Sequence, residues 1–149
     1  MEELVLYFSL KYQGDFQSIY NALLRKERVD ENLKCELKKK LKCSYTTIFS
    51  DDYPEALKLI NCPPFVLYYY GDLSLVKKKL IGVVGMRDMS DYGKKATQHF
   101  TSELVKSDYV IVSGMARGVD TVAHKSAIEN KGKTIAVLGT GIEYCYPRE

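Results

Sequence analysis

Two hydrophobic patterns follow one another along the chain. Up to about residue 44, apolar residues recur every three or four positions, which is typical of amphipathic helices. From Leu80 onwards, short apolar runs alternate with longer segments of helical periodicity, which is typical of alternating strands and helices. The pattern therefore predicts a small helical N-terminal module over residues 1–44 and an α/β domain over residues 45–149.

The two helices predicted in the N-terminal module begin at aspartates. Asp15 and Asp30 each precede a segment of helical periodicity, and an aspartate in that position accepts hydrogen bonds from the first helical N–H groups. The apolar positions of the two helices are Phe16, Ile19, Tyr20, Leu23 and Leu24, then Leu33, Leu37 and Leu41. Lysines occupy the other face of the second helix, and we interpret them as a solvated surface.

The pattern changes again in the middle of the chain. Residues 46–49 and 65–70 have the β-branched and aromatic composition of short strands. Between them, Pro54 suits the first turn of a helix that we expect to run through Ile60.

The second half of the chain predicts a parallel sheet. Its apolar runs indicate strands at residues 80–84, 109–112 and 134–138, and the periodic segments between them indicate helices at 91–107 and 119–130. Because these strands are almost continuously apolar, we expect a parallel sheet buried between helix layers. The predicted fold class is α/β, a Rossmann-like βαβαβ sheet with right-handed crossovers. The inward residues of the first of these helices are then Ala96, Phe100 and Leu104.

Each predicted strand of this sheet is followed by a glycine-rich loop. Loops at the carboxyl ends of parallel strands share one edge of the sheet, where ligands bind. Glycines let a ligand approach the backbone, Ser113 offers a hydroxyl, and the arginines offer planar donors that suit phosphate oxygens. The loops, which together predict a phosphate site, are Gly85-Met86-Arg87, Ser113-Gly114-Met115-Ala116-Arg117-Gly118 and Gly139-Thr140-Gly141. Close helix–strand packing is an equally good explanation for Gly118 and for Gly141.

Composition and charge restrict the class of protein further. A hydrophobic content of 46% is enough for a packed core, and a formal net charge of +3 is too small to attract polyanions by itself. The four cysteines have no paired spacing, which argues against a zinc site or a disulfide framework and favours a reducing compartment. No run approaches the ~20 apolar residues that a transmembrane helix needs. We expect a cytoplasmic protein without membrane partner, metal or cofactor.

Catalytic signatures are weak. The first loop lacks the Gly-x-Gly-x-x-Gly fingerprint of dinucleotide enzymes, and the chain has no P-loop. A hydrolytic triad of Ser113, Asp120 and His124 is disfavoured because His124 falls about 9 Å along its helix from the first turn. We expect Asp120 to act as a cap and His124 to be buried and hydrogen-bonded, and we do not expect an enzyme.

The loop residues resemble the DprA/Smf family of bacterial DNA-processing proteins. The resemblance runs from about Tyr45 to the end of the chain, and residues 1–44 match only loosely. The central motif is Ser113-Gly114-x-Ala116-x-Gly118-Val119-Asp120-x-x-Ala123-His124, and the flanking matches are Asp52-Tyr53-Pro54-x-x-Leu57, Val83-x-Gly85-x-Arg87, Tyr92-Gly93, Gly139-x-Gly141 and Tyr146-Pro147.

The resemblance implies a protein that binds single-stranded DNA without sequence preference. Such proteins protect incoming strands during natural transformation and help to load the RecA recombinase, without a catalytic step, and a homodimer is a further candidate assembly. Tyr144 or Tyr146 is a candidate for stacking on a base, although Tyr146 also fits a structural Tyr-Pro turn. The residues expected to bind the DNA backbone are Gly85, Arg87, Ser113, Gly114, Ala116, Arg117, Gly118, Gly139 and Gly141.

Two departures from the family pattern are visible. Met86 stands where the family usually has serine, which removes one hydroxyl donor from the first loop. The chain stops at Glu149, shortly after the Tyr-Pro motif, whereas family members continue with further strands and helices. The resemblance therefore implies a domain that is incomplete at its C-terminus.

An alternative function belongs to a different class. Small-nucleotide binders and phosphoribohydrolases share this architecture and its rim arginine. The phosphoribohydrolases carry a Pro-Gly-Gly-x-Gly-Thr turn with a nearby catalytic glutamate, and neither occurs in this chain.

Overall fold

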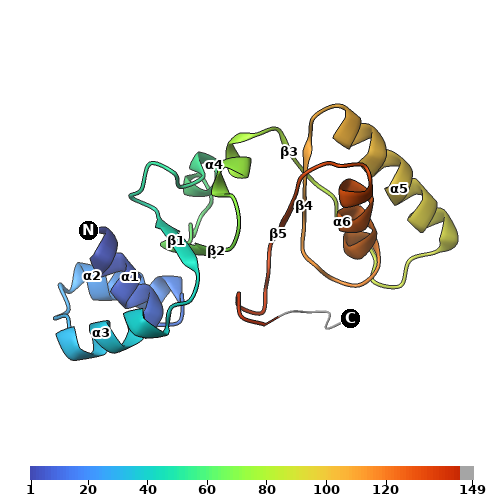
Figure 1. The fold of residues 1–149 in the computed structure, drawn as a ribbon. Coiled ribbons are helices and arrows are strands. Elements are labelled where there is room, and N and C mark those ends of the chain that lie inside the picture. The colour runs from blue at the N-terminus through green and yellow to red at the C-terminus, as the bar shows by residue number, and fades with distance from the viewer. Residues whose placement is uncertain (145–149) are drawn as a thin grey trace. The chain divides into compact units, whose positions relative to one another are not determined.

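The computed structural model describes residues 1–144 of the chain. The chain divides into two compact units, Met1–Leu73 and Ser74–Glu149 (Figure 1). This division differs from the predicted boundary at residue 44, because Tyr45, Val66 and Tyr68 pack against the first N-terminal helix. Cys145, Tyr146 and Pro147 lie outside the described residues.

Three helices form the core of the first unit, and the first of them was not predicted. The N-cap aspartates are confirmed: Asp15 accepts a hydrogen bond from the N–H of Ser18, and Asp30 accepts from two N–H groups at the start of its helix. The unpredicted helix buries residues 5–9 without a break, so it has no apolar stripe for a periodicity argument to find. The helices are α1 (Glu2–Lys11), α2 (Phe16–Leu24) and α3 (Glu31–Lys40).

A two-stranded antiparallel sheet completes the first unit. β1 (Ser44–Thr47) pairs with β2 (Val66–Tyr69), and Val66 packs against α1. The connection contains a single helical turn, α4 (Glu55–Lys58), which ends before the predicted Ile60. The Tyr53 hydroxyl donates to the carbonyl of Pro64 at 2.7 Å and thereby fixes this connection to the start of β2.

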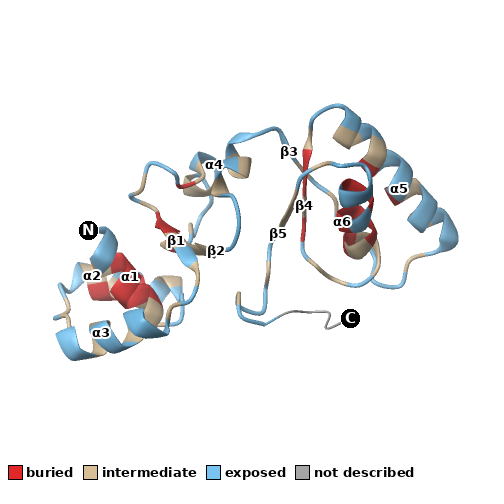
Figure 2. Cartoon of the chain, viewed as in Figure 1, coloured by how far each residue is buried: buried red, intermediate tan, exposed pale blue. Residues whose placement is uncertain are grey.

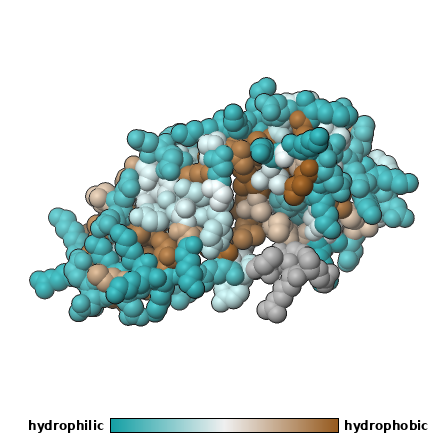
Figure 3. All heavy atoms as spheres, viewed as in Figure 1, coloured by the Kyte–Doolittle hydropathy of each residue, from teal (hydrophilic) through white to brown (hydrophobic). Residues whose placement is uncertain are grey.

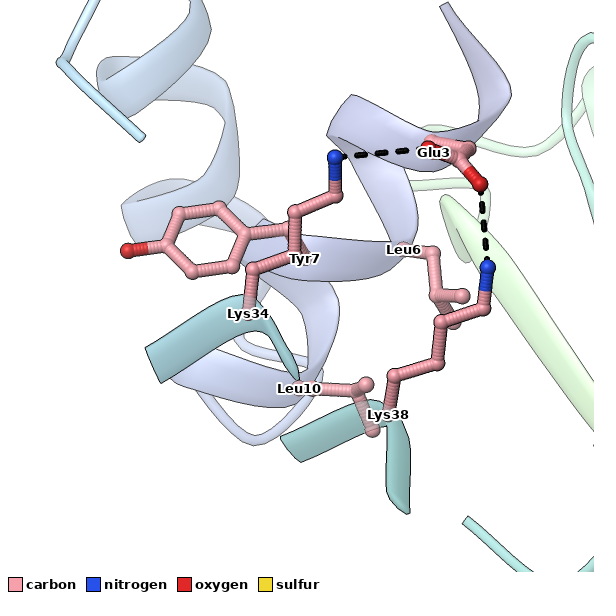
Figure 4. Close-up of a pocket in the computed structure, with 6 residues that line it drawn as sticks. All are labelled: Glu3, Leu6, Tyr7, Leu10, Lys34 and Lys38. Carbon is pink, nitrogen blue, oxygen red and sulfur yellow. Dashed lines mark hydrogen bonds and ion pairs between the residues drawn. The ribbon is translucent and has the colours of Figure 1, made fainter. Parts of the chain in front are cut away.

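One carboxylate joins α1 to α3 at a shallow pocket (Figure 4). Glu3 accepts from Lys38 at 2.9 Å and pairs with Lys34 at 3.3 Å, and these lysines hold its pKa below the ordinary value. The surface over α3 is mainly hydrophilic (Figure 3), as expected for a solvated lysine face.

The second unit confirms the predicted α/β fold class. Its sheet has the strand order β3-β4-β5, and both neighbouring pairs are parallel. A short 3₁₀ helix, η1 (Leu73–Lys77), leads into the first strand. The elements are β3 (Leu80–Gly82), α5 (Asp91–Lys106), β4 (Val110–Ser113), α6 (Val119–Glu129) and β5 (Thr134–Ala136).

Helices of the second unit cover one face of this sheet. Because the strands are adjacent in chain order, right-handed crossovers place α5 and α6 on the same side (Figure 1). Ile81 and Ile111 point into the core beneath α6, whereas Val84 and Val137 on the alternate face are exposed. The expectation that helix layers bury both faces is therefore wrong among the described residues of this unit.

The packing of α5 also differs from the prediction. Thr97 and Thr101 are buried against α6, whereas Phe100 is 65% exposed and not inward-facing. Small side chains on both helices allow this close approach, and the Ser126 hydroxyl donates to the carbonyl of Gln98. Figure 2 shows that the buried residues of the second unit concentrate in β4 and α6, while α5 is largely exposed. No helix within residues 1–144 has the length and hydrophobicity needed to span a membrane.

Candidate functional site

The first two glycine loops pack directly against each other at the carboxyl edge of the sheet. Gly118 has φ +83°, and the N–H of Val119 donates to the carbonyl of Met86 at 3.2 Å. A Cβ at Gly118 would overlap the carbonyl oxygens of Met86 and Arg87. A Cβ at Gly85 would lie 2.7 Å from Val119 Cγ2, so Gly85 leaves room for the Val119 side chain, whereas Gly118 is required by the approach of the backbone.

The third loop joins the same edge through β5. The N–H of Val137 donates to the carbonyl of Ser113 at 2.9 Å, which places the start of the third loop beside the second. Gly139 is exposed, and Gly141 has φ +81° and accepts from the N–H of Tyr144. Tyr144 is exposed, while Tyr146 lies outside the described residues. The structure thus brings the three predicted loops together.

The predicted site residues of the first two loops differ in their exposure to solvent. Arg87 and Arg117 are both exposed, on loops that contact each other. Gly114 is exposed and Ala116 is half-buried. Gly118 is the N-cap residue of α6, so it supplies the turn into the helix.

Asp120 occupies the backbone donors that were predicted to bind phosphate. Its Oδ2 accepts from the N–H of Gly114 at 3.2 Å and from the N–H of Ala116 at 3.3 Å. Thr121 donates to the carbonyl of Ala116 at 2.7 Å and holds the same loop from the other side. Asp120 is buried, so a phosphate at these two N–H groups would meet a buried carboxyl group. The predicted roles of Gly114 and Ala116 as phosphate donors therefore do not fit this structure.

Ser113 has an internal role as well. Its side chain is part of the buried sheet, with the residue only 3% exposed, and its hydroxyl donates to the carbonyl of Val83 at 2.7 Å. This bond ties the ends of β4 and β3 together. The hydroxyl is therefore not available to a ligand at the edge, in contrast to the prediction.

His124 is buried and hydrogen-bonded, as expected. Its Nδ1 lies 2.6 Å from Thr134 Oγ1, and the Thr134 hydroxyl lies 2.9 Å from the carbonyl of Ile111. The two contacts link α6 to β5 and β4. Burial holds the pKa of the imidazole below its ordinary value, against a smaller opposing effect of the Asp120 charge.

Two exposed lysines near the loops were not in the predicted site. Lys94 and Lys95 belong to the first turns of α5, which starts at the same edge of the sheet. The Ser90 side chain caps this helix by accepting from the N–H of Gly93 at 3.1 Å. The position of the two lysines, just after a strand, a loop and a helix cap, is a sequence signal that could have identified them. Residues 1–144 contain no group of three metal-ligating side chains suited to a metal ion.

A family model and several curated proteins match this chain. The model described as DNA recombination-mediator protein A matches residues 44–149. The DNA processing protein DprA of Bacillus subtilis is 45% identical over 103 residues, which cover 68% of this chain and 35% of that protein. The protein Smf of Borreliella burgdorferi is 36% identical over 142 residues, which cover 92% of this chain and 45% of that protein. The chain thus spans less than half the length of these relatives.

Two solved structures are similar to this chain. DNA processing protein A from Streptococcus pneumoniae has a TM-score of 0.74 and 37% sequence identity, and the match covers 89% of this chain and 44% of that one. DNA processing protein A from Helicobacter pylori, a structure described in terms of a single-stranded DNA binding mode, has a TM-score of 0.62 and 32% identity. That match covers 72% of this chain and 48% of the other.

The first prediction concerns the contact between the loops. Gly118→Ala is expected to lower the free energy of unfolding of the second unit by about 3 kcal/mol or more, because strain at positive φ and overlap with two carbonyl oxygens act together. Thermal denaturation followed by circular dichroism measures the effect. Gly139→Ala is the matched control, because a Cβ there meets nothing within 4 Å, and its change should stay within about 0.5 kcal/mol. Equal stability of the two variants would contradict the contact.

The second prediction concerns His124 and pH. Because the folded pKa of His124 is lowered, the unfolded chain binds more protons near its ordinary pKa, so stability falls as the pH falls through about 6.5. The melting temperature is expected to drop between about pH 7.5 and about pH 5.5, above the range in which ordinary carboxylates titrate. His124→Asn should reduce this drop, whereas His99→Asn, at an exposed position, should not. Identical drops in all three proteins would be inconsistent with a buried neutral imidazole.

Proposed function

The chain belongs to the DNA recombination-mediator protein A family, and we propose that it binds single-stranded DNA at the carboxyl edge of its parallel sheet. The observation that carries this proposal is the direct contact between the loops of Arg87 and Gly118. This contact holds two arginine-bearing loops together at an exposed edge, and the relative from Helicobacter pylori is described as binding single-stranded DNA.

The proposed contacts are made by side chains. Arg87 and Arg117 carry guanidinium groups that fit two phosphate oxygens at once, and Lys94 and Lys95 add positive charge at the start of α5. Gly85 and Gly118 shape the two loops, and the backbone around Gly139 and Gly141 borders the strand. Phosphates are the same at every nucleotide, so such contacts bind without sequence preference.

We propose binding without catalysis. Ser113, Asp120 and His124 carry the chemistry that a hydrolase would need, but each makes hydrogen bonds inside the fold. A nucleophile must lie within reach of a base to be activated, and Ser113 donates instead to a backbone carbonyl. The contacts thus support structural roles for all three residues.

The proposed biological role follows the family. The chain would protect incoming single strands during natural transformation and assist the loading of RecA, as the description of the family as a recombination mediator suggests. We place this role in the cytoplasm, which suits the exposed thiols of Cys35 and Cys62. A homodimer would double the number of arginine edges available to one strand.

The third prediction tests Arg87. Arg87→Ala should weaken binding of a labelled oligo-dT strand at least about tenfold, because a hydrogen bond to a charged group contributes roughly 1.5–3 kcal/mol. It should also reduce the steepness of the log–log salt dependence by about 0.7 for the lost phosphate contact. Fluorescence anisotropy over a series of salt concentrations measures both quantities.

Two controls sharpen the measurement. Arg87→Lys should keep the salt slope and lose part of the affinity, because lysine keeps the charge without the planar fork. Lys133→Ala removes an exposed lysine at the entrance of β5, on the opposite edge of the sheet, and should leave binding unchanged. Unaltered affinity and slope in Arg87→Ala would reject the proposed edge. Stabilisation by AMP but not by the oligonucleotide would favour the small-nucleotide alternative.

A further inference from the structure

The outer face of α5 carries several exposed aromatic and basic side chains. Tyr92 is 81% exposed and Phe100 is 65% exposed, and Lys95 and His99 are exposed between them. At 100° per residue these four positions lie on one side of the helix. We call the set Tyr92, Lys95, His99 and Phe100 the α5 stripe.

The packing of the unit does not account for this stripe. The opposite side of α5 is filled by Thr97 and Thr101, which pack against α6, and by Leu104 and Val105, which contact the core of the sheet. Phe100 instead contacts its neighbour, His99, with ring centroids 5.7 Å apart and planes tilted by 55°. Exposed aromatic rings add little to folding, so the stripe is available for a ligand.

The stripe begins next to the edge proposed to bind DNA. Tyr92 follows Arg87 by five residues, so their Cα atoms are at most about 17 Å apart. The Ser90 cap and the bond from the Thr97 hydroxyl to the carbonyl of Gly93, 2.7 Å long, fix the first turn of α5. From Tyr92 to Phe100 the helix rises about 12 Å, which matches three to four nucleotides at the ~3.4 Å spacing of a stacked strand.

We infer that the α5 stripe is a second contact segment for the same single strand, an inference that rests on the proposed function. One base stacks on Tyr92 and another on Phe100, while Lys95 contacts a phosphate between them. Aromatic rings accept every base because all bases have a π-face, so the segment binds without sequence preference. The stripe extends the strand from the Arg87 loop along α5.

The composition of the stripe favours a nucleic acid over a protein partner. The centre of a protein interface is depleted of lysine and rich in contiguous apolar contacts. Here the aromatic rings at the two ends are separated by Lys95 and His99, and Lys95 makes no ion pair among the described residues. Aromatic rings combined with basic side chains are the arrangement used by single-strand platforms.

The fourth prediction concerns binding of oligo-dT to the full chain, with strands of about 4 and about 12 nucleotides, of which only the longer has the length to contact both the Arg87 loop and the α5 stripe. Tyr92→Leu and Phe100→Leu should each weaken binding of the longer oligo-dT about fivefold or more, the lower limit for loss of one base–aromatic stack, with the salt slope unchanged. Tyr92→Phe keeps the ring and should stay near the unmodified affinity. Lys95→Ala should reduce the slope by about 0.7.

Matched controls come from α6. Ile128 is 64% exposed and Lys125 is also exposed, so Ile128→Ala and Lys125→Ala change similar side chains on the neighbouring helix and should leave binding unaltered. A second experiment uses the unmodified chain, so its result does not depend on whether a variant folds. Ultraviolet cross-linking to a strand containing 5-iodouracil, followed by mass spectrometry, should label a residue of the α5 stripe.

The outcomes separate this inference from the proposed function. If Arg87→Ala weakens binding but Tyr92→Leu and Phe100→Leu do not, and no cross-link maps to Tyr92 or Phe100, the inference is overturned and the proposed edge is retained. If the stripe variants weaken binding and Arg87→Ala does not, the edge is overturned instead. Variants that change the molecular mass in light scattering while binding the strand normally would mark a protein-docking face and refute the inference.

Discussion

The geometry of the candidate site depends on one close approach between two backbones. Gly118 passes so near the carbonyl groups of Met86 and Arg87 that no side chain fits, and Val119 donates a hydrogen bond across the same contact. The loop that carries Arg87 is therefore fixed by the start of α6. Because β4 is bonded to both neighbouring strands, the third loop is held in the same assembly through Ser113 and Val137.

The electrostatics of this edge follow from a carboxylate that belongs to the protein. A glycine loop at a helix start normally offers its N–H groups to an anion. Here Asp120 accepts from Gly114 and Ala116, so these two donors of the second loop already have a partner within the fold. In the proposed mode of binding, a phosphate is therefore bound mainly by arginine and lysine side chains, which hold charge without base-specific geometry. Nonspecific, salt-dependent binding is the chemistry that such an edge supports.

Local sequence signals predicted much of this fold. Asp15 and Asp30 cap their helices as predicted, and the three parallel strands lie within the predicted apolar runs, apart from one residue at the end of β4. What escaped prediction depends on tertiary packing. Residues 5–9 of α1 are all buried, so the helix has no apolar stripe, and Phe100 lies outside because small threonines let α5 approach α6 closely.

The motif over residues 113–124 is the most distinctive stretch of the sequence, and its polar side chains mainly stabilise the fold. α6 lies against both the sheet and α5, so the polar residues of its motif are buried and must find partners inside the fold: Asp120 in the loop, His124 at Thr134 and Ser126 at Gln98. α5 packs on one side only and keeps its other side exposed. In the proposed mode of binding, a ligand contacts residues around Arg87 and along α5, while the motif sets where those residues stand. A pattern of glycines and short polar side chains can therefore predict a phosphate site whose backbone donors are already bonded within the fold, because the same donors that suit a phosphate also suit an internal carboxylate.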